Sequence, residues 1–253
     1  MSDFSTKTLI VGHKGRMGNM LMQKATAHNL PVIGIDQPLE LNKVKEKCDD
    51  RDLIIICVPA SVIKNVLKTI CPYLKKTAII ADITSVKELP IAQMEKIWNG
   101  PIIGTHPLFG PNVQDNDEKP VAIIKSKKST KAHLNIVEQF FIQIGCKTFY
   151  TTATEHDKAV ALIQGMNFIT NLAYFALLAN QKEIMPFLTP SFKRRLDAAK
   201  KTLTEDAQLF TGLFEANPYS HEAVRKYRKM LNIAASGDLD LLCQQAKWWW
   251  EKA

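Results

Sequence analysis

Short apolar runs alternate with amphipathic segments over residues 8–151 of the chain. Seven of these runs are rich in β-branched residues, as is typical of strands buried in a parallel sheet. The segments between them carry helical patterns, as at Asn19–His28, Ala60–Ile70 and Lys131–Ile144. Alternation of this kind predicts an α/β fold with a doubly wound sheet. The predicted strands are Thr8–Val11, Pro31–Ile35, Asp52–Val58, Lys76–Asp82, Pro101–Gly104, Val121–Lys125 and Lys147–Thr151.

Strand patterns stop after Thr152, and helical periodicity continues to the C-terminus. We expect a long apolar helix from Glu155 to about Asn180, with Thr154 as its N-cap. Shorter helices are expected over residues 191–203, 206–215, 221–235 and 239–252. The sequence therefore predicts an α/β domain over residues 1–151, which the next features identify as dinucleotide-binding, and an all-α domain over residues 152–253. The run Trp248–Trp250 favours helix packing or a dimer contact over a ligand site.

The first predicted strand ends in a glycine-rich turn, GHKGRMG, at residues 12–18. Glycines let the backbone approach a pyrophosphate, whose charge is favoured at the N-terminus of the next helix. Asp36 ends the second strand, where a carboxylate accepts hydrogen bonds from ribose hydroxyls, as in Rossmann-type domains. Position 13 is His rather than Gly, so a turn built only for tight packing is the alternative. The expected cofactor is NAD, with NADP left open by Lys43 and Lys45, and the expected binding residues are Gly12, Gly15, Arg16, Met17, Gly18, Asp36, Val58 and Pro59.

His106 is the main candidate for acid–base chemistry. It lies in the segment GTHPLFGP, just past a predicted strand end, where proline and glycine restrict the chain. Imidazole titrates near neutral pH and can accept a proton from a hydroxyl. Ser85 ends a neighbouring strand and could hydrogen-bond His106 or the substrate. A loop histidine without a role and a helix N-cap are the respective alternatives.

The balance of charged residues limits the kinds of partner that we expect the protein to bind. Lys and Arg total 33 and Asp and Glu total 25, so the formal net charge is +8. This charge fits nucleic acid, an acidic membrane or a small anion. The basic run 125–131 lacks interleaved aromatic residues, which favours a solvated loop over a nucleic-acid site. No apolar run approaches the ~18 residues of a membrane span, and the N-terminus lacks a secretory pattern. We therefore expect neither a nucleic-acid nor a membrane partner.

The cysteines indicate the cellular compartment in which we expect the protein. The chain has five cysteines and no CxxC pair. An odd count without paired spacing predicts neither a disulfide framework nor a zinc site. We expect no metal and a cytoplasmic location.

Six segments that follow one another along nearly the whole chain form a recognisable set. They are GHKGRMG (12–18), DLIIICVPASV (52–62), ADITSVKELP (81–90), GPIIGTHPLFGP (100–111), TATEHDKAVALIQGMNF (152–168) and LTEDAQLFTGLFEANP (203–218). Together they resemble the prephenate dehydrogenase family, and HPLFGP and TEHD are the most specific parts of the resemblance. GHKGRM alone is also similar to the phosphate loop of dihydrodipicolinate reductases, but nothing later in the sequence supports that family.

The resemblance implies NAD-dependent oxidative decarboxylation of prephenate to 4-hydroxyphenylpyruvate, a step of tyrosine biosynthesis. It implies that His106 polarises or deprotonates the C4 hydroxyl while hydride leaves C4. Ser85 would orient His106 and the cofactor. His156, in the EHD motif, would lie near the substrate, or alternatively tie the first helix of the all-α domain to the dinucleotide-binding domain. A homodimer through the all-α domain is also implied.

The sequence departs from the family at the expected substrate contacts. Gly165–Phe168 stands where many relatives have His-Leu-Pro-His, and Lys201 and Lys193 stand at two positions that are usually arginine. Arg194 and Arg195 lie close by. Lysine neutralises a carboxylate as a point charge, without the bidentate geometry of arginine. The expected substrate is a small dicarboxylate, and arogenate or an amino-substituted prephenate is the alternative to prephenate.

Two further functions stay open at this stage. Another β-hydroxyacid-type dehydrogenase would use a lysine near the position of Lys158. An NAD-binding regulator would have kept the fold and lost the chemistry. The length of the chain predicts a monofunctional enzyme without a fused mutase or regulatory domain.

Overall fold

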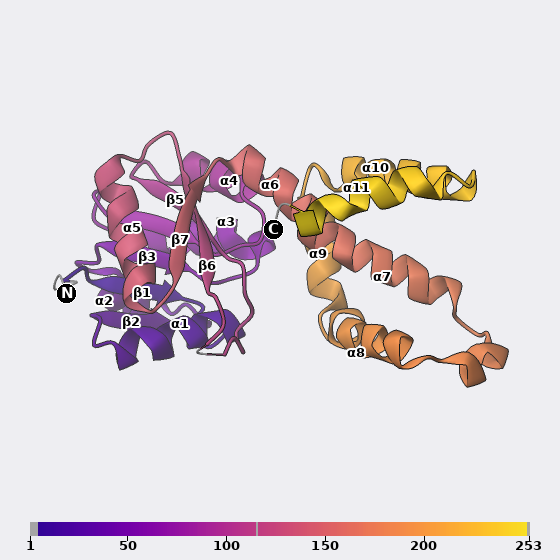
Figure 1. Cartoon of the computed structure of the whole chain (residues 1–253). Coiled ribbons are helices and arrows are strands. Elements are labelled where there is room, and N and C mark those ends of the chain that lie inside the picture. The colour runs from indigo at the N-terminus through magenta and orange to yellow at the C-terminus, as the bar shows by residue number, and fades with distance from the viewer. Residues whose placement is uncertain (1–4, 115, 252–253) are drawn as a thin grey trace. The chain divides into compact units, whose positions relative to one another are not determined.

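The computed structural model describes residues 5–114 and 116–251 and divides into two compact units (Figure 1). The first unit extends to Asp157, and the second runs from Lys158 onward. The division falls inside helix α6 (Ala153–Val160), a few residues after the boundary predicted from the sequence. Asp157 and the residues before it therefore belong structurally to the sheet-containing unit.

A seven-stranded sheet forms the centre of the first unit, with strand order β2-β1-β3-β4-β5-β6-β7. Strands β1 to β5 pair in parallel, β6 runs antiparallel to β5, and β7 is parallel to β6. This confirms the predicted doubly wound sheet. The order reverses direction between β1 and β3, and in such sheets ligands bind at the carboxyl ends of these strands. The strands are β1 (Thr8–Val11), β2 (Val32–Ile35), β3 (Leu53–Ile56), β4 (Ile79–Asp82), β5 (Ile102–Pro107), β6 (Pro120–Lys125) and β7 (Lys147–Thr151).

Helices cover both faces of the sheet (Figure 1). Helices α1 (Arg16–Ala27) and α5 (Lys131–Gln143) pack on one face through Leu21, Phe140 and Phe141. The other face is covered by α2, α3 and α4. Complete burial of a Leu, Ile or Phe side chain stabilises a fold by about 1.5–3 kcal/mol, so these two apolar layers hold the sheet in place. The bounds are α2 (Leu41–Cys48), η1 (Ala60–Val62), α3 (Ile63–Ile70), η2 (Cys71–Tyr73) and α4 (Glu88–Ile97).

Strand β5 is longer than the sequence pattern predicts. The prediction placed its end at Gly104 and His106 beyond it, whereas β5 continues to Pro107 and contains His106. The parallel pairing with β4 ends at Gly104, but the antiparallel pairing with β6 continues and sets His106 opposite Ala122. Pairing with β6 therefore fixes the backbone of His106 in the sheet.

The basic run after β6 contributes to the fold of the first unit. The Nζ atom of Lys128 donates to the carbonyl oxygens of Glu95 at 3.3 Å and Trp98 at 3.1 Å. These carbonyls lie at the C-terminal end of α4, where helix acceptors lack internal partners. Part of the predicted solvated loop thus caps a helix.

The second unit is helical, as predicted. The long predicted helix begins at Ala153 and continues through a π-helical segment, η3, to Leu177. Its cap is Thr152 rather than Thr154: the Thr152 hydroxyl accepts from the backbone N–H of Glu155, whose carboxylate accepts from the Thr152 N–H, both at 3.1 Å. This reciprocal pair is a capping box. The remaining bounds are η3 (Ala161–Gly165), α7 (Met166–Leu177), η4 (Lys182–Phe187), α8 (Pro190–Thr204), α9 (Ala207–Ala216), α10 (Ser220–Ala235) and α11 (Leu239–Glu251).

Candidate active site

The glycine-rich turn forms a backbone cradle after β1. Gly12 has φ +87°, and a Cβ on Gly18 would lie 2.2 Å from the carbonyl oxygen of Gly12. The Gly15 N–H donates to that same oxygen at 3.1 Å. Helix α1 begins immediately afterwards, so its N-terminal N–H groups lie beside the turn, an arrangement that suits a phosphate.

Asp36 lies at the end of β2 and is tied to this turn. Its Oδ2 accepts from the backbone N–H of Lys14, and its Oδ1 accepts from that of Gln37, both at 2.8 Å. A cleft of about 530 Å³ lies over this region. The cleft brings together five of the eight predicted cofactor residues, namely Gly12, Gly15, Asp36, Val58 and Pro59, with Val11, Lys14, Gln37, Leu39, Cys57, Val62 and Val66.

The other three predicted cofactor residues do not line the cleft. Arg16 is exposed at the start of α1, and Met17 packs against the core beneath the turn. Gly18 is buried beneath the carbonyl of Gly12. The backbone cradle, the carboxylate and the adjoining cleft together fit a dinucleotide.

A chain of hydrogen bonds links His106 to the start of α6. The Nδ1 atom of His106 lies 2.9 Å from Nε2 of His156, and Nδ1 of His156 lies 2.8 Å from Oδ1 of Asp157. Asp157 also accepts from the backbone N–H groups of Lys87 at 2.8 Å and Glu88 at 2.9 Å. His106, His156 and Asp157 are all buried. The sequence pointed to both histidines but assigned no role to Asp157.

A buried ion pair, formed by Lys87 and Asp82, lies beside these hydrogen-bonded side chains. The Nζ atom of Lys87 donates at 2.6 Å both to Oδ2 of Asp82 and to the carbonyl oxygen of Thr105, the residue before His106. Both charged side chains are fully buried. Burial lowers the pKa of Lys87, against the opposing effect of the Asp82 carboxylate. Lys87 therefore joins the carboxyl ends of β4 and β5 beneath His106.

The surroundings of His106 favour its neutral form. Burial, followed by the Lys87 ammonium and the His156 ring, holds the pKa of His106 well below its ordinary value of 6.5. Charged groups disfavour a like charge nearby, and an apolar environment disfavours any charge. His106 is thus unprotonated and able to accept a proton at neutral pH.

Ser85 lies between β4 and α4, half-buried. Among the described side chains, the partner of His106 is His156, and Ser85 has no hydrogen bond to the ring. The N-cap role that was the alternative for Ser85 falls to Asp157, which accepts two N–H groups at the start of α4. The expectation that Ser85 orients His106 stays a prediction.

The basic candidates belong to α8 in the second unit. Arg194 and Lys201 are seven residues apart and share one exposed side of the helix. The guanidinium of Arg195 instead lies 4.0 Å from the centre of the Tyr174 ring on α7. Lys193 is exposed. Lys158, the candidate of the β-hydroxyacid hypothesis, lies with its Nζ 5.4 Å from the centre of the Tyr219 ring.

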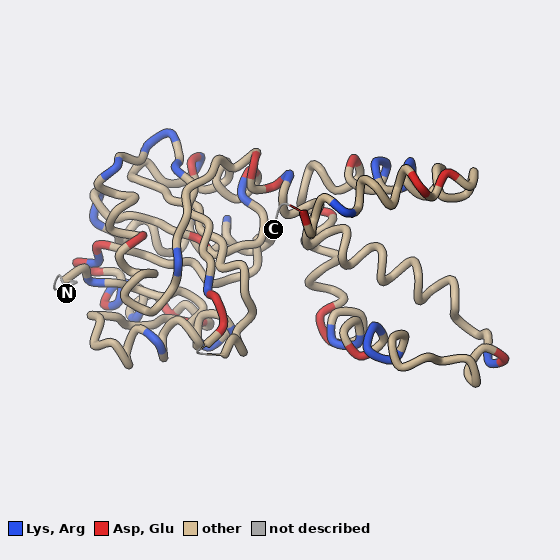
Figure 2. Tube along the Cα trace, viewed as in Figure 1, with Lys and Arg blue, Asp and Glu red and all other residues tan. Residues whose placement is uncertain are grey.

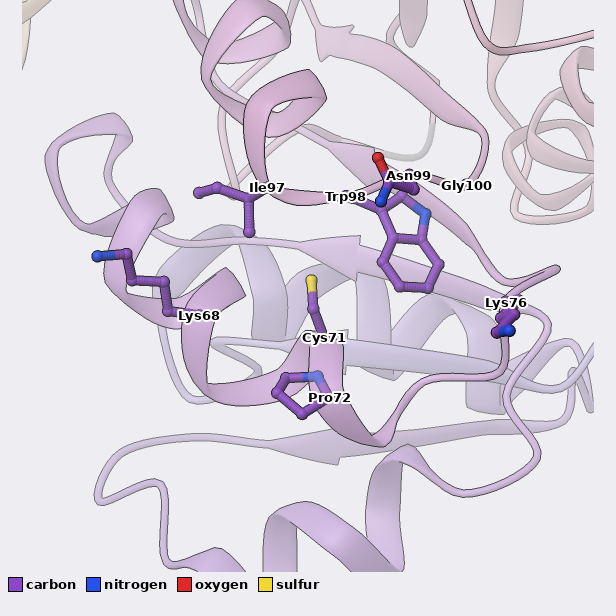
Figure 3. Close-up of a pocket in the computed structure, with 8 residues that line it drawn as sticks. All are labelled: Lys68, Cys71, Pro72, Lys76, Ile97, Trp98, Asn99 and Gly100. Carbon is purple, nitrogen blue, oxygen red and sulfur yellow. The ribbon is translucent and has the colours of Figure 1, made fainter.

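A second cleft of about 660 Å³ lies elsewhere on the first unit (Figure 3). It is formed at the C-terminal ends of α3 and α4, which lead into the amino ends of β4 and β5. It is therefore at the sheet edge away from the glycine turn, and none of the predicted site residues lines it. Its lining consists of Lys68, Cys71, Pro72, Lys76, Ile97, Trp98, Asn99 and Gly100.

Comparison with known sequences gives relatives over most of the chain. The T-protein of Haemophilus influenzae is 26% identical over 212 residues, covering 82% of this chain and 55% of the relative. A probable arogenate/prephenate dehydrogenase of Methanocaldococcus jannaschii is 27% identical over 177 residues, covering 66% and 39%. The chain thus spans about half the length of these relatives or less.

Comparison with solved structures gives the same fold over nearly full lengths. Prephenate dehydrogenase from A. aeolicus, solved with hydroxyphenyl propionate and NAD⁺, aligns with a TM-score of 0.82 at 19% identity, covering 100% of this chain and 98% of the other. Synechocystis arogenate dehydrogenase aligns with a TM-score of 0.79 at 20% identity, covering 98% and 99%.

The family comparison covers most of the first unit, from within α1 onward. Residues 23–150 match the family described as "Prephenate dehydrogenase, nucleotide-binding domain". This segment contains β2 to β6, all but the last residue of β7, the Asp82–Lys87 pair and His106, and it amounts to just over half of the 253 residues. The chain belongs to the prephenate dehydrogenase family.

Proposed function

We propose that this protein is an NAD-dependent prephenate dehydrogenase, which converts prephenate to 4-hydroxyphenylpyruvate and CO₂. The observation that carries the proposal is a buried, neutral His106, hydrogen-bonded to His156, in the same unit as a cradle that fits a dinucleotide. The names of the relatives and the NAD⁺ in the A. aeolicus structure support it. The test is NADH formation from prephenate and NAD⁺ by the purified protein, and the proposal fails if neither prephenate nor arogenate is oxidised.

His106 acts as the base in this reaction. Bound NAD⁺ supplies the hydride acceptor. As hydride leaves C4, positive charge develops at that carbon and the hydroxyl proton becomes acidic, so a base of low pKa suffices. Loss of CO₂ then makes the ring aromatic, and the proton returns to the phenolic oxygen. The aromatic product supplies the driving force, and the protein contributes position and proton transfer.

Arg194 and Lys201 are the residues that we assign to a substrate carboxylate. They share an exposed side of α8, where Nζ of Lys201 also lies 3.9 Å from Oδ2 of Asp206, whereas the guanidinium of Arg195 lies over the Tyr174 ring. We expect Lys201→Met to raise KM for prephenate by about tenfold, the equivalent of about 1.4 kcal/mol, with a smaller change in kcat. Steady-state kinetics measure this. Lys200→Met, also exposed on α8, is the control, and an equal rise in KM in both variants would contradict the assignment.

Arogenate is the alternative substrate. It carries an amino acid side chain in place of the pyruvyl group, so the two substrates differ in charge at that end. A lysine in place of arginine binds a carboxylate without bidentate geometry. Comparing kcat/KM for prephenate and arogenate in the wild-type protein decides between them.

The cofactor preference depends on Asp36. The turn and cleft would hold the pyrophosphate at residues 12–18 and the ribose at Asp36, whose carboxylate repels a 2′-phosphate. We expect Asp36→Ser to raise the ratio of NADP⁺ to NAD⁺ efficiency by about tenfold or more. Initial rates with each cofactor measure the ratio. Glu46→Gln removes an equal charge on α2 and is expected to leave the ratio unchanged; a ratio unmoved by Asp36→Ser would contradict this role.

A homodimer through the second unit is the final part of the proposal. Helix α7 carries no charged residue (Figure 2), and large side chains such as Leu177, Phe187 and Trp250 are 68%, 80% and 79% exposed. Extended exposed apolar surface marks interaction sites. The helix Ala153–Leu177 also has the length and hydropathy of a membrane span, a weak signal that the core helices of soluble proteins share.

The dimer is measured by light scattering during gel filtration without detergent. The wild type is expected at twice the 28.5 kDa chain mass, and Leu177→Asp is expected to weaken self-association by about tenfold or more. Lys182→Asp, just beyond the same helix, is the control for an added acidic side chain. A wild-type protein that elutes as a monodisperse monomer would overturn the proposed homodimer. Wild-type protein that is recovered from the column only in the presence of detergent would instead indicate a membrane-bound helix.

A further inference from the structure

The hydrogen-bond chain behind His106 fixes where its protons lie. The Asp157 carboxylate accepts from two backbone N–H groups, Lys87 and Glu88, and these donors favour its ionised form. An ionised carboxylate has no proton to donate. The 2.8 Å contact between Oδ1 of Asp157 and Nδ1 of His156 therefore requires a proton on that nitrogen.

The position of the proton on His156 in turn determines the position of the proton on His106. A neutral His156 with its proton on Nδ1 has a bare Nε2, which can only accept. The 2.9 Å contact with His106 therefore requires the proton of His106 on Nδ1. Nε2 of His106 is therefore unprotonated and carries a lone pair, as a base requires. Which nitrogen of a histidine is free is set by the bond that the other nitrogen makes.

The electrostatics of the two rings differ. His106 lies close to the Lys87 ammonium, which disfavours a positive charge on its ring, and burial disfavours it further. His156 instead contacts the Asp157 carboxylate directly. The Lys87 charge is itself paired with Asp82. A proton taken up by this group is therefore better placed on His156 than on His106.

We propose that His156 and Asp157 form a proton relay behind His106. They hold His106 with its proton on Nδ1, and His156 receives that proton while Nε2 of His106 accepts the proton of the substrate hydroxyl. The O–H bond and the His106 Nδ1–H bond break, and two N–H bonds form, on Nε2 of each ring. His106 ends neutral, and His156 ends as a cation paired with the Asp157 carboxylate. Both transfers reverse when decarboxylation produces the phenolate, so no external acid is required.

This relay rests on the proposed function only for its transfer step. The resting positions of the protons are a property of the free protein, because the three side chains belong to one unit and need no substrate to make their contacts. His156 and Asp157 are thus positioning residues that act through His106. The experiment separates the two claims.

Imidazole ¹⁵N NMR of the full-length protein labelled at histidine tests the resting state. Wild type is expected to show Nδ1 protonated and Nε2 bare on both His106 and His156 at pH 8. His156→Gln retains an acceptor oxygen and is expected to preserve this form of His106. His156→Phe removes the acceptor and is expected to give a mixture of both forms. A wild-type His106 protonated on Nε2 would overturn the proposal, whether or not the protein oxidises prephenate.

Kinetics test the transfer step. We expect kcat to fall by about 100-fold in His156→Phe, at the low end of the range for acid–base groups. In His156→Gln we expect a smaller fall in kcat, because the amide oxygen of glutamine still orients His106. Wild-type kcat in both His156 variants would overturn the relay. His28→Gln changes an exposed histidine that takes no part in the relay, and it is the control.

Discussion

His106→Asn is expected to lower kcat for prephenate oxidation by about 10²–10⁴-fold, the range attributed to a positioned acid–base group. Asparagine keeps a polar side chain that can contact His156, but it cannot accept the hydroxyl proton. The loss should appear in kcat and kcat/KM equally, because the interaction is made in the transition state. Steady-state kinetics with prephenate and NAD⁺ measure it.

Cofactor binding provides the control for this variant. The glycine turn and Asp36 lie at the ends of β1 and β2, on strands other than β5. Calorimetry is therefore expected to give the same affinity for NAD⁺ in wild type and His106→Asn. A variant that binds NAD⁺ normally and retains most of the wild-type kcat would remove His106 from the mechanism.

Lys87→Met is expected to lower the free energy of unfolding by about 3–5 kcal/mol, the cost of leaving one partner of a buried ion pair without the other. Methionine fills much of the same volume, so the main loss is the charge beside Asp82. The Asp82 carboxylate is fully buried and would keep only the polar contacts from Thr84. Urea unfolding followed by circular dichroism measures the change through the midpoint.

Lys75→Met is the matched control. Lys75 also contacts an aspartate, Asp52, but both side chains are more than 30% exposed. Exposed pairs contribute about 0–1 kcal/mol, so this variant should unfold close to wild type. A double variant Asp82→Asn/Lys87→Met is expected to lose less than the sum of the single losses, because each single change strands the other charge. Equal losses for Lys87→Met and Lys75→Met would contradict the argument.

The local patterns of the sequence were sufficient to place the strands, apart from the extent of β5, and the glycine-rich turn. Each buried strand is a contiguous apolar run, and the turn that contains Gly12 and Gly18 is specified by neighbours in the chain. The place of Asp36 at the end of the second strand was predicted for the same reason, since Asp36 directly follows β2. Features decided within one strand–turn–helix unit need no knowledge of distant contacts.

The roles of Lys87 and Asp157 could not be read in this way. Asp157 binds the N–H of Lys87 across 70 positions of sequence, and Lys87 binds the carbonyl of Thr105 across 18. The sequence offers one signal for each: a lysine directly after the apolar Val86, and an acid directly after His156. Neither signal specifies a partner. The extent of β5 was missed because β6, a later strand, supplies the pairing that continues it.

Several expectations from the sequence stay predictions. They include the roles of Ser85 and Lys193, the cytoplasmic location, and the absence of nucleic-acid and membrane partners. Among the described residues, no group of three or more His, Cys, Asp or Glu side chains is arranged to hold a metal ion. The rival β-hydroxyacid assignment gains no support from Lys158, which contacts the Tyr219 ring.

The position of His106 within β5 has a consequence for motion. β5 is an interior strand, paired on both sides, and His106 sits where the pairing with β6 continues. Backbone amides of interior strands exchange with solvent only through large openings of the structure. We therefore expect the amide of His106 to be among the slowest to exchange deuterium in this chain. The backbone that carries the base is then held rigidly in the sheet. Any rearrangement during turnover therefore has to bring substrate and cofactor to His106.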